Sequence, residues 1–182
     1  MSAAPSEPAP SAGPATPAPA VPSLDVPQGP VQVASPPLHI TYPAVEMDQD
    51  VLALSPTEQE LTLGSIVPPH TVEAYWLAPY GSPGAGSTNT TYIVGHSWEG
   101  RGSPFNNISA RSQPGDQFTV TTEQGTLGFK VDAITTENKS TLEASPIWDI
   151  VPGRLILITC FTEDLWGKNI IIEASPLETQ SR

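Results

Sequence analysis

Two short, strongly apolar runs near the C-terminus constrain the fold more than any other feature of the sequence. They are Arg154-Leu155-Ile156-Leu157-Ile158-Thr159 and Asn169-Ile170-Ile171-Ile172-Glu173. Both are rich in β-branched residues, and both are too short and too evenly apolar for amphipathic helices. They therefore predict buried β-strands.

Further strands are indicated by alternating or β-rich segments that lie between turn residues. Such segments are 38–42, 91–94 and 117–121. Another, 126–134, pairs with 117–122 across Glu123-Gln124-Gly125, a hairpin-length connection that contains glycine. Helical signals are confined to one turn near 105–110 and another near 142–148. We therefore expect an all-β domain of about eight strands, either a barrel or a sandwich, with one or two short helices.

The first part of the chain differs in composition from the rest. Eleven of the 22 prolines lie within residues 1–37, among Ala, Ser and Gly and few large apolar side chains. Such sequence cannot bury enough apolar surface to offset the entropy lost on ordering, and its prolines favour extended conformations. We therefore expect a stalk or linker over 1–36, one domain over 37–176 and a short tail over 177–182.

The charge of the chain argues against several classes of partner. Nineteen acidic residues oppose seven basic ones, for a formal net charge of −12, and no Lys or Arg precedes Arg101. Phosphate binding depends on clustered cations, so nucleic acid and anionic lipid are poor candidates. Solubility is the simpler explanation of the acidity.

Localisation depends on how the start of the chain is interpreted. No apolar run is long enough to cross a bilayer, and residues 1–20 lack the basic start and apolar centre of a signal peptide. Either the chain is cytoplasmic or its export segment has been removed. Because a proline-rich stalk is typical between a membrane anchor and an exported domain, we expect the extracellular face of the cell membrane, with the anchor absent from this chain.

The single cysteine, Cys160, excludes an intramolecular disulfide and a multi-cysteine zinc site. It ends an apolar run and precedes the polar segment 161–164, so a rigid strand could present it to a cleft, as a nucleophile requires. A small buried hydrophobe is the alternative role. The acidic residues show no calcium-loop spacing, and no metal or cofactor is expected.

A cysteine nucleophile usually needs a histidine to move its protons, and the chain has three. His39 lies inside an alternating strand, as a packing or surface residue would. His70 follows two prolines in a loop and is expected to be solvated. His96 follows a strand that ends in Gly95 and opens a Gly- and Ser-rich loop. Because two strand ends of one sheet can meet, His96 and Cys160 are the candidate catalytic pair.

Four short motifs occur in an order and spacing that is hard to obtain by chance. They are Tyr92-Ile93-Val94-Gly95-His96, Gly102-Ser103-Pro104-Phe105-Asn106-Asn107-Ile108, Pro114-Gly115-Asp116 and Leu155-Ile156-Leu157-Ile158-Thr159-Cys160. From about Pro37 to Ala174, the chain that carries them resembles the sortases, particularly the actinobacterial groups called classes E and F. Each motif alone is weak, whereas the ordered set is specific.

The resemblance implies a closed eight-stranded β-barrel with a groove for a sorting signal of the Leu-Pro-x-Thr-Gly type. It implies that Cys160 attacks the Thr carbonyl to form an acyl-enzyme, that His96 protonates the departing Gly amine, and that an incoming amine resolves the thioester. The implied partners are a surface protein or pilin that carries the signal and an amine acceptor, either a peptidoglycan precursor or a pilin lysine. We expect a monomer. Thr159 is a candidate substrate contact, and the segment 137–150 resembles the variable groove wall in which specificity lies.

The family's arginine, on the strand after the cysteine, has no counterpart here. The segment reads Trp166-Gly167-Lys168-Asn169-Ile170, and by spacing Asn169 takes the arginine's place beside Lys168. Neighbouring strand residues face opposite sides, so only one of the two can face the groove unless a bulge intervenes. We favour Asn169, whose amide can donate to an oxyanion, over a lysine without the forked donors of arginine. Arg101 could swing over the site, although a solvated loop cation is the simpler role, and Arg154 lies at the far end of its strand.

Two other functions fit part of the sequence. One is a noncatalytic or degenerate sortase-like barrel that binds an extended peptide or glycan. The other is an L,D-transpeptidase, also a β-rich Cys/His enzyme, whose histidine and cysteine lie close together in a compact motif with more glycine and a nearby arginine. The chain lacks that compact motif, and the strand-end positions of His96 and Cys160 favour the transpeptidase of the sortase type.

Overall fold

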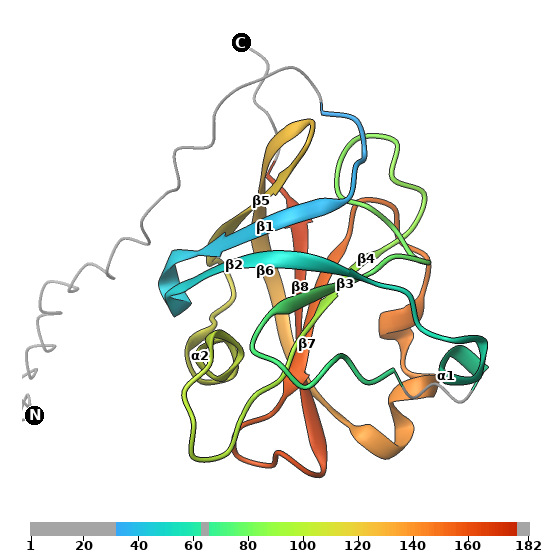
Figure 1. Ribbon diagram of the computed structural model, residues 1–182. Coiled ribbons are helices and arrows are strands. Elements are labelled where there is room, and N and C mark those ends of the chain that lie inside the picture. The colour runs from blue at the N-terminus through green and yellow to red at the C-terminus, as the bar shows by residue number, and fades with distance from the viewer. Residues whose placement is uncertain (1–31, 63–65, 178–182) are drawn as a thin grey trace, which may run out of the picture.

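Eight strands close into one barrel in the order β1-β2-β3-β4-β7-β8-β6-β5 (Figure 1). The structure is a computed structural model that describes residues 32–62 and 66–177. The strands are β1 (Pro37–Tyr42), β2 (Met47–Leu54), β3 (Ala74–Leu77), β4 (Thr91–Val94), β5 (Gln117–Thr122), β6 (Gly125–Asn138), β7 (Leu155–Cys160) and β8 (Lys168–Pro176). The expected all-β architecture is confirmed, and of the two predicted arrangements the structure has the barrel rather than the sandwich.

The strand β7 is buried on both faces, which explains its even apolarity. Leu155 and Leu157 belong to a cluster with members from all eight strands, which fills the barrel. Ile156 and Ile158 belong to a second cluster on the opposite face of β7, where Ile147 packs. By contrast, β5 alternates buried and partly exposed residues, because only one of its faces meets the core.

Among residues 32–62 and 66–177, five short helical segments lie around the barrel. They are α1 (Glu58–Thr62), α2 (Pro104–Arg111) and the 3-10 helices η1 (Pro43–Val45), η2 (Lys139–Ala144) and η3 (Pro146–Trp148). The helix α2 begins with a Ser103 cap and Pro104 in its first turn, and it buries Phe105 and Ile108. The expected turns near 105–110 and 142–148 correspond to α2 and to the pair η2 and η3. Figure 1 shows α1 and α2 on opposite sides of the barrel.

Two strands and part of a third were not located from the sequence. Both β2 and β3 lie between segments of mixed polarity, and β2 carries exposed acidic residues. The strand β6 continues four residues beyond the expected Ile134, where its side chains are polar and largely exposed. The backbone of this extension pairs with β8, up to Asn138 opposite Lys168. The backbone partner, rather than an apolar pattern, therefore determines where β6 ends.

Most of the predicted stalk and tail lies outside the described residues, so these domain boundaries remain predictions. Residues 33–35 are described, and they attach to the loop before β4. Val33 bridges Ala85, the Ala34 amide donates to the Ala85 carbonyl over 2.9 Å, and the Ser35 amide donates to the Pro83 carbonyl over 3.1 Å. These contacts place residues just before β1 against the barrel domain.

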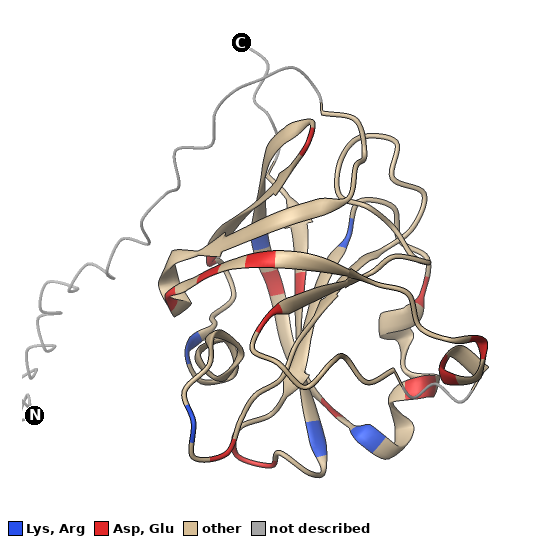
Figure 2. Cartoon of the chain, viewed as in Figure 1, with Lys and Arg blue, Asp and Glu red and all other residues tan. Residues whose placement is uncertain are grey.

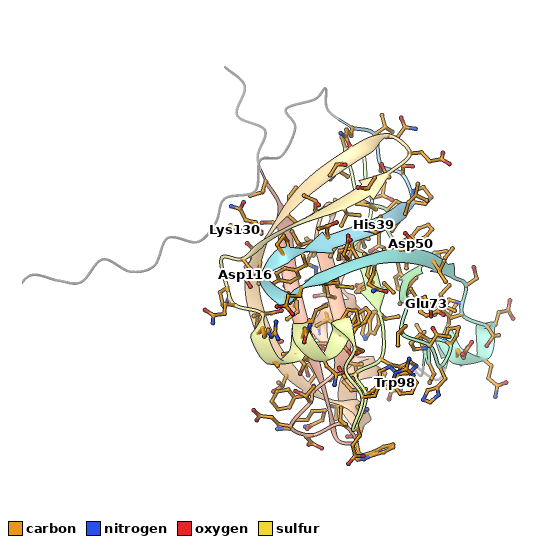
Figure 3. All side chains as sticks on the ribbon, turned by 60° about the vertical axis from the view of Figure 1, so that its left-hand side comes forward. His39, Asp50, Glu73, Trp98, Asp116 and Lys130 are labelled. Atoms are coloured by element: carbon orange, nitrogen blue, oxygen red, sulfur yellow. The ribbon has the colours of Figure 1, made fainter. Side chains whose placement is uncertain are left out.

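Acidic residues outnumber basic residues over the domain. Acidic residues are spread over strands, loops and α1, and basic residues are fewer (Figure 2). Figure 3 shows His39 and Asp50 on the barrel surface. His39 lies between two carboxylates, 2.7 Å from Asp48 and 2.8 Å from Asp50. These two hydrogen bonds raise the pKa of His39. Among the described residues, no helix combines the length and apolarity needed to span a membrane.

Candidate active site

The strands β4 and β7 are parallel neighbours, and their shared direction brings His96 and Cys160 together. Val94 lies opposite Ile158, and the Gly95 amide donates to the Ile158 carbonyl over 3.2 Å. Cys160 is the last residue of β7, and His96 follows β4 by two residues. Because parallel strands end at the same edge of a sheet, both side chains line one groove.

This groove has a volume of about 230 Å³ and walls that are mainly apolar. Its apolar lining comes from the ends of β3, β4 and β7, from residues 66–68, and from Leu142 and Trp148 of the connection between β6 and β7. Its polar lining is His96, Lys139, Thr159, Cys160 and Asn169. An apolar groove with a few convergent polar groups is the usual form of a binding or active site.

Cys160 is a free thiol and is only partly buried. This exposure argues against the alternative role of a small buried hydrophobe. Lys139 Nζ lies 3.3 Å from its Sγ, and Asn169 is its partner across the β7–β8 pair. The sulfur is therefore accessible from the groove and has a cation as its direct neighbour.

His96 is held from two sides. Its Nε2 lies 3.0 Å from the Pro68 carbonyl oxygen, which only accepts hydrogen bonds, so Nε2 carries a proton. Its ring lies 5.3 Å from the ring of His70 and 5.9 Å from the ring of Trp98. His70 is exposed, as expected, but its ring also packs 4.3 Å from Trp98. In the described part of the chain, no hydrogen bond joins His96 to Cys160.

The second motif, 102–108, fixes the loop that follows His96. The Ser103 hydroxyl donates to the His96 carbonyl over 3.1 Å. The Asn106 amide accepts from the Trp98 backbone N–H and donates to the Trp98 carbonyl, both over 2.8 Å. The ring of Phe105 packs so closely on Gly95 that no Cβ fits there. The motif therefore positions the histidine by backbone contacts and by packing.

The alternation of β8 separates Asn169 from Lys168. Asn169 lines the groove opposite Cys160, whereas Lys168 is partly exposed and lies outside the lining. Within the described residues, the Asn169 side-chain amide has no hydrogen-bond partner. Its two N–H donors are therefore available to a bound substrate.

Solved structures with a similar fold come from several bacteria. Sortase C1 from Streptococcus agalactiae matches with a TM-score of 0.56 and 18% identity, over 77% of this chain and 66% of that chain. Sortase A from Corynebacterium diphtheriae matches with a TM-score of 0.57 and 18% identity, over 80% and 62%. Sortase C-1 from Actinomyces oris matches with a TM-score of 0.56 and 20% identity, over 77% and 73%. The fold is that of the sortases.

At these identities the similarity concerns the fold. The chain spans slightly less than two thirds of the S. agalactiae and C. diphtheriae sortases. No protein-family model and no curated protein matches the sequence. The three sortases named above are of types A and C, so closeness to classes E and F stays a prediction.

Thr159 and Arg101 occupy different surroundings in the sortase fold. Thr159 is 3% exposed at the groove, and its hydroxyl lies 2.9 Å from that of Ser97, so it ties the two strand ends together. Arg101 is exposed and lies outside the groove lining, with its guanidinium 5.1 Å from the centre of the Trp98 ring. A hydrogen bond from Thr71 lowers the pKa of Glu73, and the charge of Arg101 makes a smaller contribution in the same direction.

Lys139 is the site residue that sequence reasoning missed. It opens η2, and besides contacting Cys160 Sγ its Nζ donates to the Leu165 carbonyl over 2.5 Å. No motif marks it. A signal was nevertheless present, because Lys139 is the only basic residue within 137–150, the segment expected to form the groove wall.

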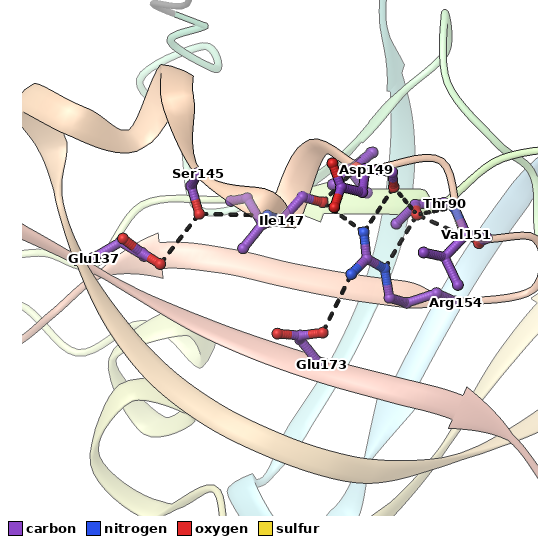
Figure 4. A network of polar contacts seen from close by, with 9 residues as sticks. Thr90, Glu137, Ser145, Ile147, Asp149, Val151, Arg154 and Glu173 are labelled. Carbon is purple, nitrogen blue, oxygen red and sulfur yellow. Dashed lines mark hydrogen bonds and ion pairs between the residues drawn. The ribbon is translucent and has the colours of Figure 1, made fainter.

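The groove wall is anchored from its far side by Arg154 (Figure 4). Its guanidinium donates to the carbonyls of Ile147 and Asp149 over 2.8 and 2.7 Å, and it pairs with Glu173 at 3.4 Å. The Arg154 side chain is 16% exposed. Arg154 directly precedes β7, at the end of that strand far from Cys160, and it is absent from the groove lining, as the sequence predicts.

The site offers no evident metal centre. Among the described residues, no group of three or more His, Cys, Asp or Glu side chains is arranged to hold a metal ion. The polar groups that line the groove are a thiol, an imidazole, a hydroxyl, an amide and an ammonium group.

Proposed function

We propose that the protein is a sortase-type cysteine transpeptidase. It cleaves an LPxTG-like sorting signal between Thr and Gly and transfers the acyl group to an amine. The observation that carries this proposal is the placement of Cys160 and His96 in one groove, at the ends of adjacent parallel strands of a sortase fold.

The reaction has two acyl transfers. The Cys160 thiolate attacks the Thr carbonyl carbon, and His96 gives a proton to the Gly nitrogen as the C–N bond breaks. The product of this half is a thioester on Cys160. An amine then attacks the thioester, His96 takes its proton, and the thiolate leaves. In both halves, the Asn169 amide donates to the oxyanion of the tetrahedral intermediate.

The groove and its surroundings suit this substrate class. Its apolar lining, which includes Leu77, Val94 and Ile158, can cover the Leu-Pro part of an extended signal. The substrate is a surface protein or pilin, and the acceptor is a peptidoglycan precursor or a pilin lysine. The protein works as a monomer at the extracellular face of the membrane, and we place it nearest to classes E and F.

A second candidate is a degenerate, noncatalytic barrel that binds an extended peptide or glycan. One observation favours it, because no arginine lines the groove within the described residues. The L,D-transpeptidase alternative loses its support, since the fold is that of the sortases.

The test compares cleavage of fluorogenic sorting peptides by the intact protein, Cys160→Ala and His96→Ala. We expect both variants to lose activity, while Ser175→Ala, at the far end of β8, keeps it. Persistent cleavage by Cys160→Ala would refute the transpeptidase. If the intact protein is inert towards all peptides while a thiol reagent labels Cys160, the degenerate binding module is the better description.

A further inference from the structure

The reacting sulfur of this protein has a lysine as its polar neighbour. Lys139 Nζ lies 3.3 Å from Cys160 Sγ and 2.5 Å from the Leu165 carbonyl oxygen. The Lys139 backbone N–H also donates to the Gly167 carbonyl over 2.9 Å. Both ends of the residue are therefore tied to the loop between β7 and β8, which limits the positions that its ammonium group can take.

An ammonium group has three N–H donors, and the described contacts use two of them. One points to Sγ and one to the Leu165 carbonyl. The third is available to a substrate, and Lys139 is part of the groove lining. A carbonyl carbon bonded to Sγ carries its oxygen within a few ångströms of the sulfur, which is within reach of this donor.

The other cations of the domain are less well placed. Lys168 and Arg101 lie outside the groove lining, and Arg154 is engaged with the carbonyls behind the groove wall. Asn169 can donate hydrogen bonds but brings no charge. The positive charge at the groove is therefore supplied by η2 rather than by β8.

We propose that Lys139 is a catalytic residue that pairs with the Cys160 thiolate and then stabilises the oxyanion. This inference rests on the proposed function. As the S–C bond forms, negative charge leaves Sγ and develops on the carbonyl oxygen, and the ammonium group neutralises both ends of this displacement without giving up its proton. The family's arginine lies on the strand after the cysteine, whereas the cation proposed here is Lys139 at the start of η2, which contacts the sulfur directly.

The first test measures the alkylation rate of Cys160 by iodoacetamide at pH 7, followed by intact mass. A thiolate beside a cation is the reactive form, so Lys139→Met slows labelling about tenfold and Lys139→Arg restores most of it. The matched control is Lys130→Met. Lys130 pairs with Ser175, six positions along β8 from Asn169 (175 − 169), or roughly 20 Å away. Labelling of Lys139→Met within twofold of wild type overturns the proposal, because a mere loop tether would not slow it.

The second test measures kcat and KM with a cleaved sorting peptide. Lys139→Met lowers kcat about tenfold or more while KM changes little, since the interaction strengthens in the transition state. An unchanged kcat overturns the catalytic role even where alkylation slows. If the wild type cleaves no peptide, the proposed function fails, and the alkylation rates still decide whether Lys139 acts on the thiol.

Discussion

Replacing Gly95 by alanine tests the packing that positions the candidate histidine. Gly95 joins β4 to His96, and the ring of Phe105 from α2 covers it. A Cβ at this position would lie 2.5 Å from Phe105 Cδ2 and closer still to two other ring carbons. Gly95 is not among the glycines with positive φ, so alanine is allowed by the backbone and its cost is steric alone.

The magnitude follows from how little the ring can move. Phe105 is fully buried against the barrel, so relief requires α2 to shift or the end of β4 to bend. Overpacking of this kind costs about 1–3 kcal/mol. We expect Gly95→Ala to lower the free energy of unfolding by that amount, and to lower peptide cleavage further because His96 moves with its neighbour.

The assay is urea unfolding of Gly95→Ala, Phe105→Leu and the double variant. A smaller side chain removes the overlap, so Gly95→Ala should cost at least about 1 kcal/mol less in the Phe105→Leu background, a coupling typical of residues in contact. The reasoning is refuted if Gly95→Ala costs the same in both backgrounds. It is also refuted if the single change costs under roughly 0.5 kcal/mol, the usual range for surface substitutions.

Three further perturbations probe the other parts of the domain. Asp48 and Asp50 raise the pKa of His39 above its usual 6.5, so the ion pairs of protonated His39 stabilise the fold below about pH 6.5 and are lost as pH rises through the raised pKa. The melting temperatures of wild type and His39→Gln should differ more at pH 5.5 than at pH 9, and an equal difference would contradict the ion pairing. Arg154→Met removes a charged donor from the carbonyls of Ile147 and Asp149, which keep their hydrogen bonds from Tyr92 and Thr90. It should cost about 1.5–3 kcal/mol in urea unfolding and raise KM through a loosened groove wall, and a KM unchanged despite the lost stability would count against the wall's role. Asn169→Ala should reduce peptide cleavage about tenfold or more, and Lys168→Ala by less; the reverse order would assign the oxyanion to Lys168.

Much of the barrel could be predicted because its strands have local signatures. The β-rich runs at 154–159 and 169–173 and the hairpin around Glu123-Gln124 depend on neighbouring residues alone, and the structure has strands at each of these places. The strands β2 and β3 have no such signature. The first carries outward-facing acidic residues, and the second is only four residues long, so their pairing within the barrel decides their conformation.

The candidate site also contains residues that the sequence marks and one that it does not. His96 and Cys160 stand at recognisable strand ends, and the parallel pairing of β4 and β7 makes them neighbours. Lys139 has no local mark of function, because its role depends on a distance to a residue 21 positions later in the chain. Sequence spacing could not reveal that η2 folds back over the loop between β7 and β8.

The sequence by itself determined the strand-rich class of the domain, the single thiol available for chemistry and the histidine that follows a glycine-terminated strand, since each depends on residue type and short-range pattern. Only the tertiary structure decided that the barrel closes, that Asn169 rather than Lys168 lines the groove, and that Lys139 reaches Cys160 Sγ. The physical reason is that closure and side-chain proximity arise from hydrogen-bonded pairing between distant segments, whose register no local pattern specifies.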